Sequence, residues 1–219
     1  MSRRMTIAML AVSLSMLLFG CVFSRSGSYR FKMTVEAETA QGPRFGSSVY
    51  EAMAHRTLKL TSEESEGSGG IRGQATILDL PSGPVFVLLR TPTMGDDLDS
   101  VATLAMRPSA ATGHFSDYLK AVRSLGGWFG GGKADLPRKD WPLMVRFGDL
   151  RDPTTAELVD PRTIGVMRIT VETTGADLTE GIDTRLSWLG RDRLTLGDKG
   201  TMGLAMGGSH LKNGDFWRH

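Results

Sequence analysis

The segment GWFGGGKA, residues 127–134, comes nearest to a known phosphate-binding loop. It matches G-x-x-x-x-G-K-[ST], whose backbone N–H groups and lysine hold nucleotide phosphates, except that Ala134 stands where a hydroxyl must bind Mg²⁺. The loop of that motif joins a buried strand to a helix, whereas this segment follows a predicted helix and Pro137 interrupts any helix after it. We therefore predict a connector with Trp128 and Phe129 packed or at its tip, and no nucleotide partner.

Three other polar groupings lack the partners that their chemistry needs. SHLK, ending at Lys212, matches the S-x-x-K pair of some acyl-transfer enzymes, but only seven residues follow it and no partner motif is present. Asp96, Asp97 and Asp99 lack the alternation of a calcium-binding EF-hand loop. The histidines have no metal-ligand spacing: His55, His114, His210 and His219. The sequence therefore predicts no metal, no cofactor and no identified catalytic residue.

Composition excludes further classes of protein. The 219 residues include 26 basic and 24 acidic side chains, and Arg3 and Arg4 account for the excess. The rest of the chain is balanced, so we expect no nucleic-acid partner. Cys21 is the single cysteine, which excludes an intramolecular disulfide and a zinc site built on several thiolates.

The first 21 residues, MSRRMTIAMLAVSLSMLLFGC, have the layout of an export signal, with a cationic start and then an apolar run. Leu18, Phe19, Gly20 and Cys21 resemble a bacterial lipobox, in which a leucine, a variable residue and a small residue precede an invariant cysteine. Phe19 departs from the small or β-branched residue that the pattern prefers. The resemblance implies that signal peptidase II recognises Leu18, Phe19 and Gly20, cuts before Cys21, and leaves that cysteine acylated.

The expected organisation is a signal peptide at 1–20, a lipidated cysteine and tether at 21–28, and one β-rich globular domain at 29–219. Val22 follows the cysteine, whereas an aspartate there retains enteric lipoproteins in the inner membrane. The resemblance therefore implies an outer-membrane lipoprotein facing the periplasm. Two alternatives stay open. Residues 5–23 are apolar enough to span the inner membrane as an uncleaved helix, or the chain is simply secreted.

Apolar and polar residues alternate along YRFKMTVEAE, residues 29–38, which predicts a strand with one buried face. Residues 44–55 read as the returning strand, with a bulge or a close backbone approach at Gly46. Two more hairpins are expected, one turning at PSGP and one at Asp152-Pro153. A further strand at 166–174 is predicted to point Met167, Ile169 and Val171 inward.

The remaining elements complete the predicted fold class, which is α+β with β-rich antiparallel hairpins and one short amphipathic helix. The helix is expected at 115–125, capped by Ser116. Residues 98–106 fit a strand or a short helix, and 61–70 are expected to form a solvated loop. Phe216 and Trp217 are expected to dock the end of the chain on the domain.

Four segments together resemble an uncharacterised group of hypothetical proteins from Gram-negative bacteria. The segments are YRFKMTVEAET, GSSVYE, VRFGDLRDPTTAELVDP and RITVETT, and they cover much of 29–175. This resemblance supplies no functional residues.

The sequence therefore predicts a membrane-anchored envelope lipoprotein, a non-enzymatic binding or structural module with a membrane and an envelope protein as its partners. The alternative is a hydrolase-like periplasmic enzyme with dispersed catalytic residues. An exposed apolar patch would favour the first hypothesis, and a pocket with convergent polar groups and shifted pKa values would favour the second.

Overall fold

The computed structural model describes residues 26–57, 66–92, 97–189, 202–206, 209–211 and 213–218, with the backbone alone for 202–206, 209–211 and 213. Leu18, Phe19, Gly20 and Cys21, and with them the predicted signal peptide and cleavage site, lie outside the described residues. Within the described ranges no helix combines the length and the apolar character needed to cross a membrane.

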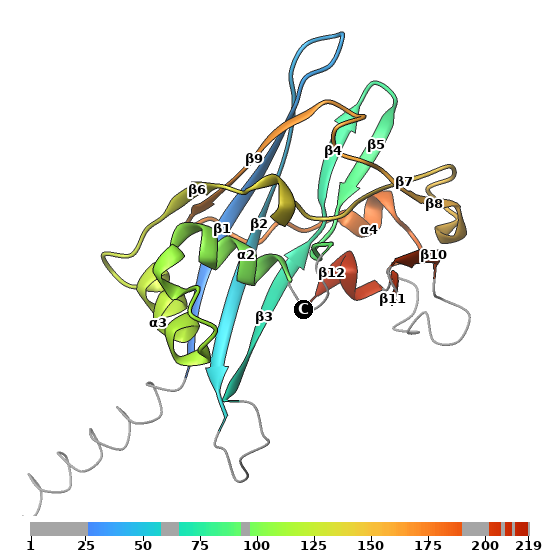
Figure 1. Ribbon diagram of the computed structural model, residues 1–219. Helices are drawn as coiled ribbons and strands as arrows, with labels where there is room; N and C mark the ends of the chain where they lie inside the picture. The colour runs from blue at the N-terminus through green and yellow to red at the C-terminus, as the bar shows by residue number, and fades with distance from the viewer. Residues whose placement is uncertain are drawn as a thin grey trace, which may run out of the picture.

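The larger sheet has six strands in the order β12-β3-β2-β1-β9-β6, and every neighbouring pair is antiparallel (Figure 1). Its strands are β1 (Ser26–Ala37), β2 (Arg44–Arg56), β3 (Gly67–Gln74), β6 (Lys133–Asp135), β9 (Val166–Thr173) and β12 (Trp217–Arg218). β1 and β2 form the long predicted hairpin, and β1 begins three residues before the predicted start at Tyr29.

A second antiparallel sheet has the order β4-β5-β7-β8. Its strands are β4 (Thr76–Leu80), β5 (Gly83–Val87), β7 (Met144–Phe147) and β8 (Ala156–Leu158). Both predicted hairpins, β4–β5 and β7–β8, are confirmed. A separate hairpin joins β10 (Met202–Met206) to β11 (Ser209–Leu211). The described part of the chain is therefore mainly β and antiparallel, as predicted.

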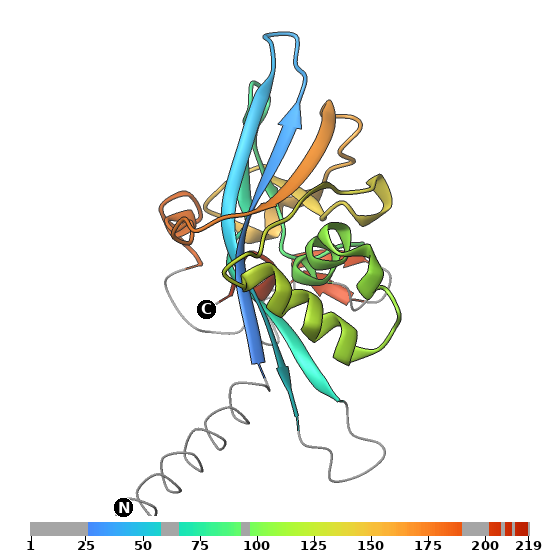
Figure 2. The ribbon, with the colours of Figure 1, turned by 90° about the vertical axis from the view of Figure 1, so that its left-hand side faces the viewer.

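Helices α2 (Leu98–Met106) and α3 (Phe115–Gly126) lie on one face of the larger sheet (Figures 1 and 2). The helix predicted at 115–125 is confirmed, but the prediction of a single helix is too low, since α2 and the short α4 (Ile182–Arg185) are also present. The cap at Ser116 is wrong, because His114 holds the N-cap position of α3. Four 3₁₀ turns complete the elements of the described residues: Pro108–Ala110, Arg138–Asp140, Pro153–Thr155 and Asn213–Asp215.

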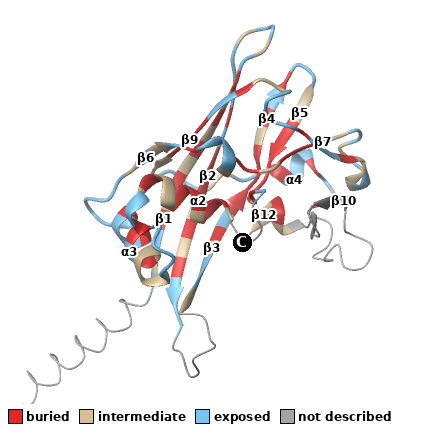
Figure 3. Ribbon diagram, in the orientation of Figure 1, coloured by how far each residue is buried: buried red, intermediate tan, exposed pale blue. Residues whose placement is uncertain are grey.

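The buried face of β1 follows the predicted alternation and forms the centre of the core (Figure 3). It buries five side chains: Tyr29, Phe31, Met33, Val35 and Ala37. The Tyr29 hydroxyl lies 2.8 Å from Thr103 Oγ1 of α2, so this face meets the helices. The opposite face carries charged pairs, such as Arg168 Nη2 with Glu36 Oε2 at 2.7 Å. Alternation fixes the two faces because successive strand residues point to opposite sides.

Two predictions about the strands are wrong. Residues 67–70 are not loop but the start of β3, because they pair with residues 53–56 of β2, while 61–65 lie outside the described residues. A Cβ at Gly67 would lie 2.1 Å from Phe115 Cε1, so glycine there leaves room for α3. Met167 does not point inward and is 60% exposed. The register of β9 against β1 shifts between Glu36 and Ala37, which makes Met167 the extra residue of a bulge and interrupts the alternation.

The two sheets meet where β2 crosses β4. A Cβ at Gly46 would lie 2.4 Å from the carbonyl oxygen of Ile77, so only glycine permits this approach, as the sequence predicted. No bulge accompanies it, because the register of β1 and β2 continues through Gly46.

The end of the described chain closes the same region. Phe216 is fully buried, and its ring centroid lies 5.7 Å from that of Trp188 and 6.0 Å from that of Phe147. Trp217 pairs with Gln74 of β3. The predicted docking of Phe216 and Trp217 is confirmed.

Candidate functional site

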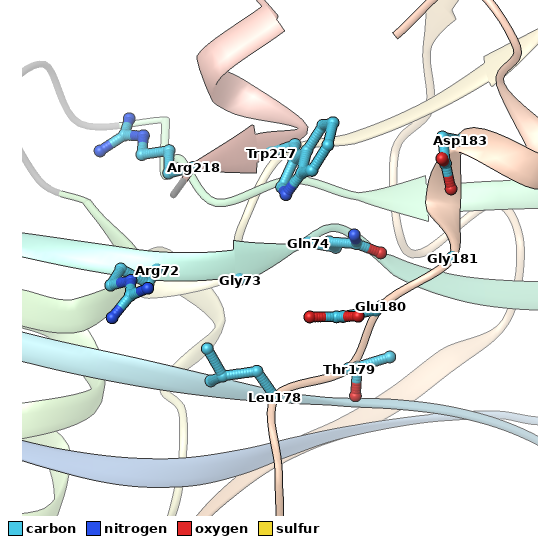
Figure 4. Close-up of a pocket in the computed structure, with 10 residues that line it drawn as sticks. All are labelled: Arg72, Gly73, Gln74, Leu178, Thr179, Glu180, Gly181, Asp183, Trp217 and Arg218. Atoms are coloured by element: carbon cyan, nitrogen blue, oxygen red, sulfur yellow. The ribbon is translucent and has the colours of Figure 1, made fainter. Parts of the chain in front are cut away.

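A pocket of about 340 Å³ lies where β3 separates from β2 (Figure 4). The two strands pair as far as Glu51 and Arg72. Gly73 then has a φ of 140°, a backbone conformation that favours glycine, and the strand turns away. Beyond this point Gly73 and Gln74 pair with β12 instead of β2. The fork opens a space between segments that are distant in the sequence.

The segment 178–181 fills the other side of the fork. Thr179 takes the place of a strand partner for β2, since its N–H donates to the Val49 carbonyl at 3.3 Å and its Oγ1 accepts from the Val49 N–H at 2.9 Å. The pocket walls are therefore three segments, 72–74, 178–183 and 217–218. Binding sites often form where packed units meet in this way.

Gln74 supplies a buried polar group at the pocket wall. Its Oε1 accepts a hydrogen bond of 2.8 Å from the backbone N–H of Ile182. Because a backbone N–H can only donate, the oxygen must face Ile182, and the NH₂ group must face away from it. Among the described residues no acceptor meets this NH₂ group, although Gln74 is buried. A buried donor without a hydrogen bond is unfavourable, and an acceptor on a ligand or a water in the pocket would satisfy it.

The pocket carries two carboxylates that the described residues leave without a cation. Its arginines are already paired, Arg72 with Glu51 at 3.2 Å and Arg218 with Asp97 through both of its terminal nitrogens. Glu180 and Asp183 are exposed, and neither has an ion pair in the described part of the chain. The pocket therefore favours ligands that donate hydrogen bonds.

The half-buried indole of Trp217 adds a flat apolar surface. In Figure 4 Trp217 and Glu180 lie on opposite sides of β3, and Gln74 lies between them. Apolar area beside convergent polar groups is the usual composition of a small-molecule site. The arrangement can hold a ligand with a flat apolar face, several donors and one acceptor.

A second hollow, of about 350 Å³, has a different character. Its floor includes the buried residues Trp141, Met144 and Val159, and exposed Arg138 and Arg162 stand at its edge. The guanidinium of Arg138 lies 5.0 Å from the centroid of the Trp141 ring. This hollow offers no buried polar group without a partner, so we take the pocket at the fork as the candidate site.

The other described sequence candidates are not among the residues that line this pocket. Lys133 lies on β6 and its Nζ pairs with Glu172 Oε2 at 3.3 Å, and the loop before it joins α3 to β6. Asp97 binds Arg218, which lines the pocket, whereas the carboxylate of Asp99 accepts from Tyr118, so the two neighbouring acids have different partners. His55 contacts Ser68 Oγ at 2.8 Å. Several candidates lie outside the described residues or have no described side chain: Asp96, Ser209, His210, Lys212 and His219.

Asp99 is the most buried acid of the helical layer, at 3% exposed. Its Oδ2 accepts from the Tyr118 hydroxyl at 2.8 Å, and its backbone oxygen accepts from Thr103 Oγ1 at 2.7 Å. Loss of solvent on burial raises the pKa of Asp99 above its ordinary value, and the charge of Asp97 adds to the rise. The Tyr118 hydrogen bond and Arg218 oppose it. Burial and the Asp99 charge also raise the pKa of Tyr118.

We expect the stability of Asp99→Asn relative to wild type to increase as the pH rises from about 4 to 7. A carboxyl whose pKa is raised on folding contributes its stability below the pKa of the unfolded state, and that contribution is lost as the pH rises through the folded-state pKa. Asparagine keeps an acceptor for Tyr118 but cannot ionise. Urea unfolding at several pH values measures the difference.

Asp160→Asn is the opposite control. Arg162 holds the pKa of Asp160 below its ordinary value, so this variant should lose relative stability as the pH rises. A flat or falling profile for Asp99→Asn would contradict the account of Asp99.

Sequence reasoning missed every residue of the pocket at the fork except Trp217, which it assigned to docking. The local signal was Gly73, because a glycine within a strand often marks a bend or a close backbone approach. In the described part of the chain no group of three or more His, Cys, Asp or Glu side chains could hold a metal ion. No protein-family model matches the chain, and neither a curated protein nor a solved structure matches it.

Proposed function

We propose that this protein is a membrane-anchored envelope lipoprotein whose domain is a non-enzymatic binding module. The lipobox-like sequence ending at Cys21 supports the anchor, and Val22 supports an outer-membrane position facing the periplasm. An uncleaved helix in the inner membrane stays the alternative anchor. We assign the domain to the α+β class, because α2 and α3 cover one face of the larger sheet.

The observation that carries the binding function is the NH₂ group of buried Gln74 at the pocket wall. This NH₂ group can donate a hydrogen bond to an acceptor on a ligand, and the carboxylates of Glu180 and Asp183 can accept hydrogen bonds from donors on it. The indole of Trp217 can contact a flat apolar face of the ligand. An N-acetylated amino sugar combines these features, since it has an amide carbonyl, several O–H and N–H donors, and a C–H face. We infer that the ligand is an oligosaccharide of this class.

Titration with a tetrasaccharide of N-acetylglucosamine, followed by isothermal calorimetry, tests this proposal. We expect wild type to bind it and Glu180→Gln to bind about tenfold more weakly or worse, because a charged acceptor is lost. Asp177→Asn is the matched control, since Asp177 lies three residues away but does not line the pocket. Equal binding of a glucose tetrasaccharide, or no effect of Glu180→Gln, would contradict the proposed ligand.

The same pair of carboxylates favours the second candidate function, a hydrolase that acts on such a ligand. Glycoside hydrolases use two carboxyl groups, one of them an acid with a raised pKa. Among the described acids, Asp99 is the one whose pKa burial raises, and it does not line the pocket, which favours binding over catalysis. Mass spectrometry of the incubated tetrasaccharide decides. Cleavage that both Glu180→Gln and Asp183→Asn abolish would assign the enzyme instead.

A further inference from the structure

The turn at 127–130 holds two aromatic side chains in solvent. Trp128 and Phe129 are 95% and 98% exposed, more than any other large apolar side chain in the described ranges. The N–H of Gly130 donates to the carbonyl of Gly127 at 2.7 Å, so the two aromatic residues occupy the central positions of a tight turn. Large apolar side chains that are exposed side by side mark a contact surface.

The base of this turn is fastened to the domain. Arg107 Nη2 donates to the Gly131 carbonyl at 2.7 Å. Gly132 N–H donates to Thr173 Oγ1 at 3.0 Å, and Thr173 N–H donates to the Gly132 carbonyl at 2.9 Å. The two rings are therefore presented at a defined place on the domain.

The turn lies beside the point where the chain enters the domain. A Cβ at Gly126 would lie 2.1 Å from the Ser28 carbonyl oxygen, and one at Gly27 would lie 2.5 Å from Arg123 Cγ. The last turn of α3 therefore packs on the first residues of β1, and the loop after it projects at the left of Figure 1. Cys21 precedes Ser26 by five residues, which reach at most about 18 Å.

We propose that the Trp128–Phe129 turn docks on the lipid bilayer that anchors the chain, with both rings at the level of the headgroups. The proposal rests on the membrane anchor of the proposed function, because the anchor brings a bilayer within reach of the turn. Tryptophan favours the membrane interface, and phenylalanine is common on the apolar side of interfacial elements. Arg123 and Lys133 are exposed on either side of the turn, and their positive charges suit anionic headgroups, although Lys133 also pairs with Glu172.

Docking would fix the orientation of the domain on the membrane. β1 has 12 residues, so the tip of the β1–β2 hairpin lies about 36 Å from the point of entry. Phe45 is 61% exposed and pairs with Glu36 near that tip. A probe at Phe45 therefore reports on the end of the domain away from the bilayer.

Tryptophan fluorescence of the full chain tests the docking. The protein is reconstituted in vesicles of phosphatidylethanolamine and phosphatidylglycerol, with or without lipids brominated near the headgroup. The difference between wild type and Trp128→Phe isolates the emission of Trp128 from that of the other three tryptophans. We expect bromine to quench this emission, and we expect the emission maximum to lie at a shorter wavelength than in detergent-free protein whose anchor has been removed by proteolysis.

The double variant Trp128→Phe/Phe45→Trp is the matched control, and its introduced indole should not be quenched. If Trp128 of the acylated protein is not quenched, the docking proposal is overturned, and the turn would then be a contact surface for a protein partner. Equal quenching at both positions also overturns it. The intact mass of the same protein tests the lipoprotein proposal separately from the docking. If residues 1–20 remain and no acyl mass is found, the lipoprotein proposal fails. Quenching of Trp128 in that protein would still support docking, beside an uncleaved helix.

Discussion

Replacing Phe216 with alanine is expected to lower the free energy of unfolding by about 3–5 kcal/mol. The side chain is fully buried and packs against the rings of Phe147 and Trp188. Its removal leaves a cavity where the second sheet meets the larger one, and it also removes two aromatic pairs. Urea unfolding followed by circular dichroism measures the change.

The same variant should weaken the pocket at the fork. The Phe216 carbonyl accepts from the Ala75 N–H at 2.8 Å, and the next residue, Trp217, pairs with Gln74. Loss of the Phe216 packing should therefore weaken the pairing of β12 with β3, and β12 forms one wall of the pocket. Phe216→Leu should recover most of the stability because it refills most of the volume.

Phe45→Ala is the control for aromatic removal, because Phe45 is largely exposed. It should change the free energy of unfolding by no more than about 0.5 kcal/mol. A loss below about 1 kcal/mol for Phe216→Ala would mean that the end of the described chain is not part of the core.

The parts of the fold that could be predicted from the sequence are those that depend on local pattern. The alternation at 29–38 predicted β1 because a strand with one buried face has a period of two. The spacing of apolar residues at 115–125 predicted α3 for the corresponding reason. The turn residues at PSGP and at Asp152-Pro153 predicted the two short hairpins.

The failures come from contacts between distant segments. Gly67 begins a strand because it pairs with Arg56 of β2, and the residues 61–70 alone do not show that partner. Met167 points outward because a bulge forms against β1. The polar composition of 61–70 favours a loop, and the alternation along 166–174 favours an inward Met167.

The pocket at the fork could not be predicted for the same reason. Gln74, Glu180 and Trp217 belong to three segments that the topology brings together, and their spacing in the sequence carries no motif. The sequence predicted that Trp128 and Phe129 lie in a connector, but it did not decide whether their side chains are packed or exposed. The direct contact of Gly126 with Ser28, which puts the turn beside the entry point, depends on how α3 packs on β1.

Cys21→Ala is expected to abolish lipid attachment completely, because the acyl chains of a lipoprotein are bound to the thiol and the new amine of that one residue. A single acyl chain binds a bilayer weakly and reversibly, whereas several chains together hold firmly, at about 0.8 kcal/mol for each buried CH₂. The chain has no second cysteine that could substitute. The loss should therefore be all or none, which makes this the sharpest measurement of the membrane anchor.

Intact mass and membrane fractionation of wild type beside Cys21→Ala is the measurement that tests the lipoprotein account most directly. We expect wild type to lose residues 1–20, gain the mass of acyl chains and float with the outer membrane, while Cys21→Ala does none of these. The contradicting result is that both proteins keep residues 1–20 and stay in the inner membrane. Cys21 would then be one more apolar residue of an anchor helix.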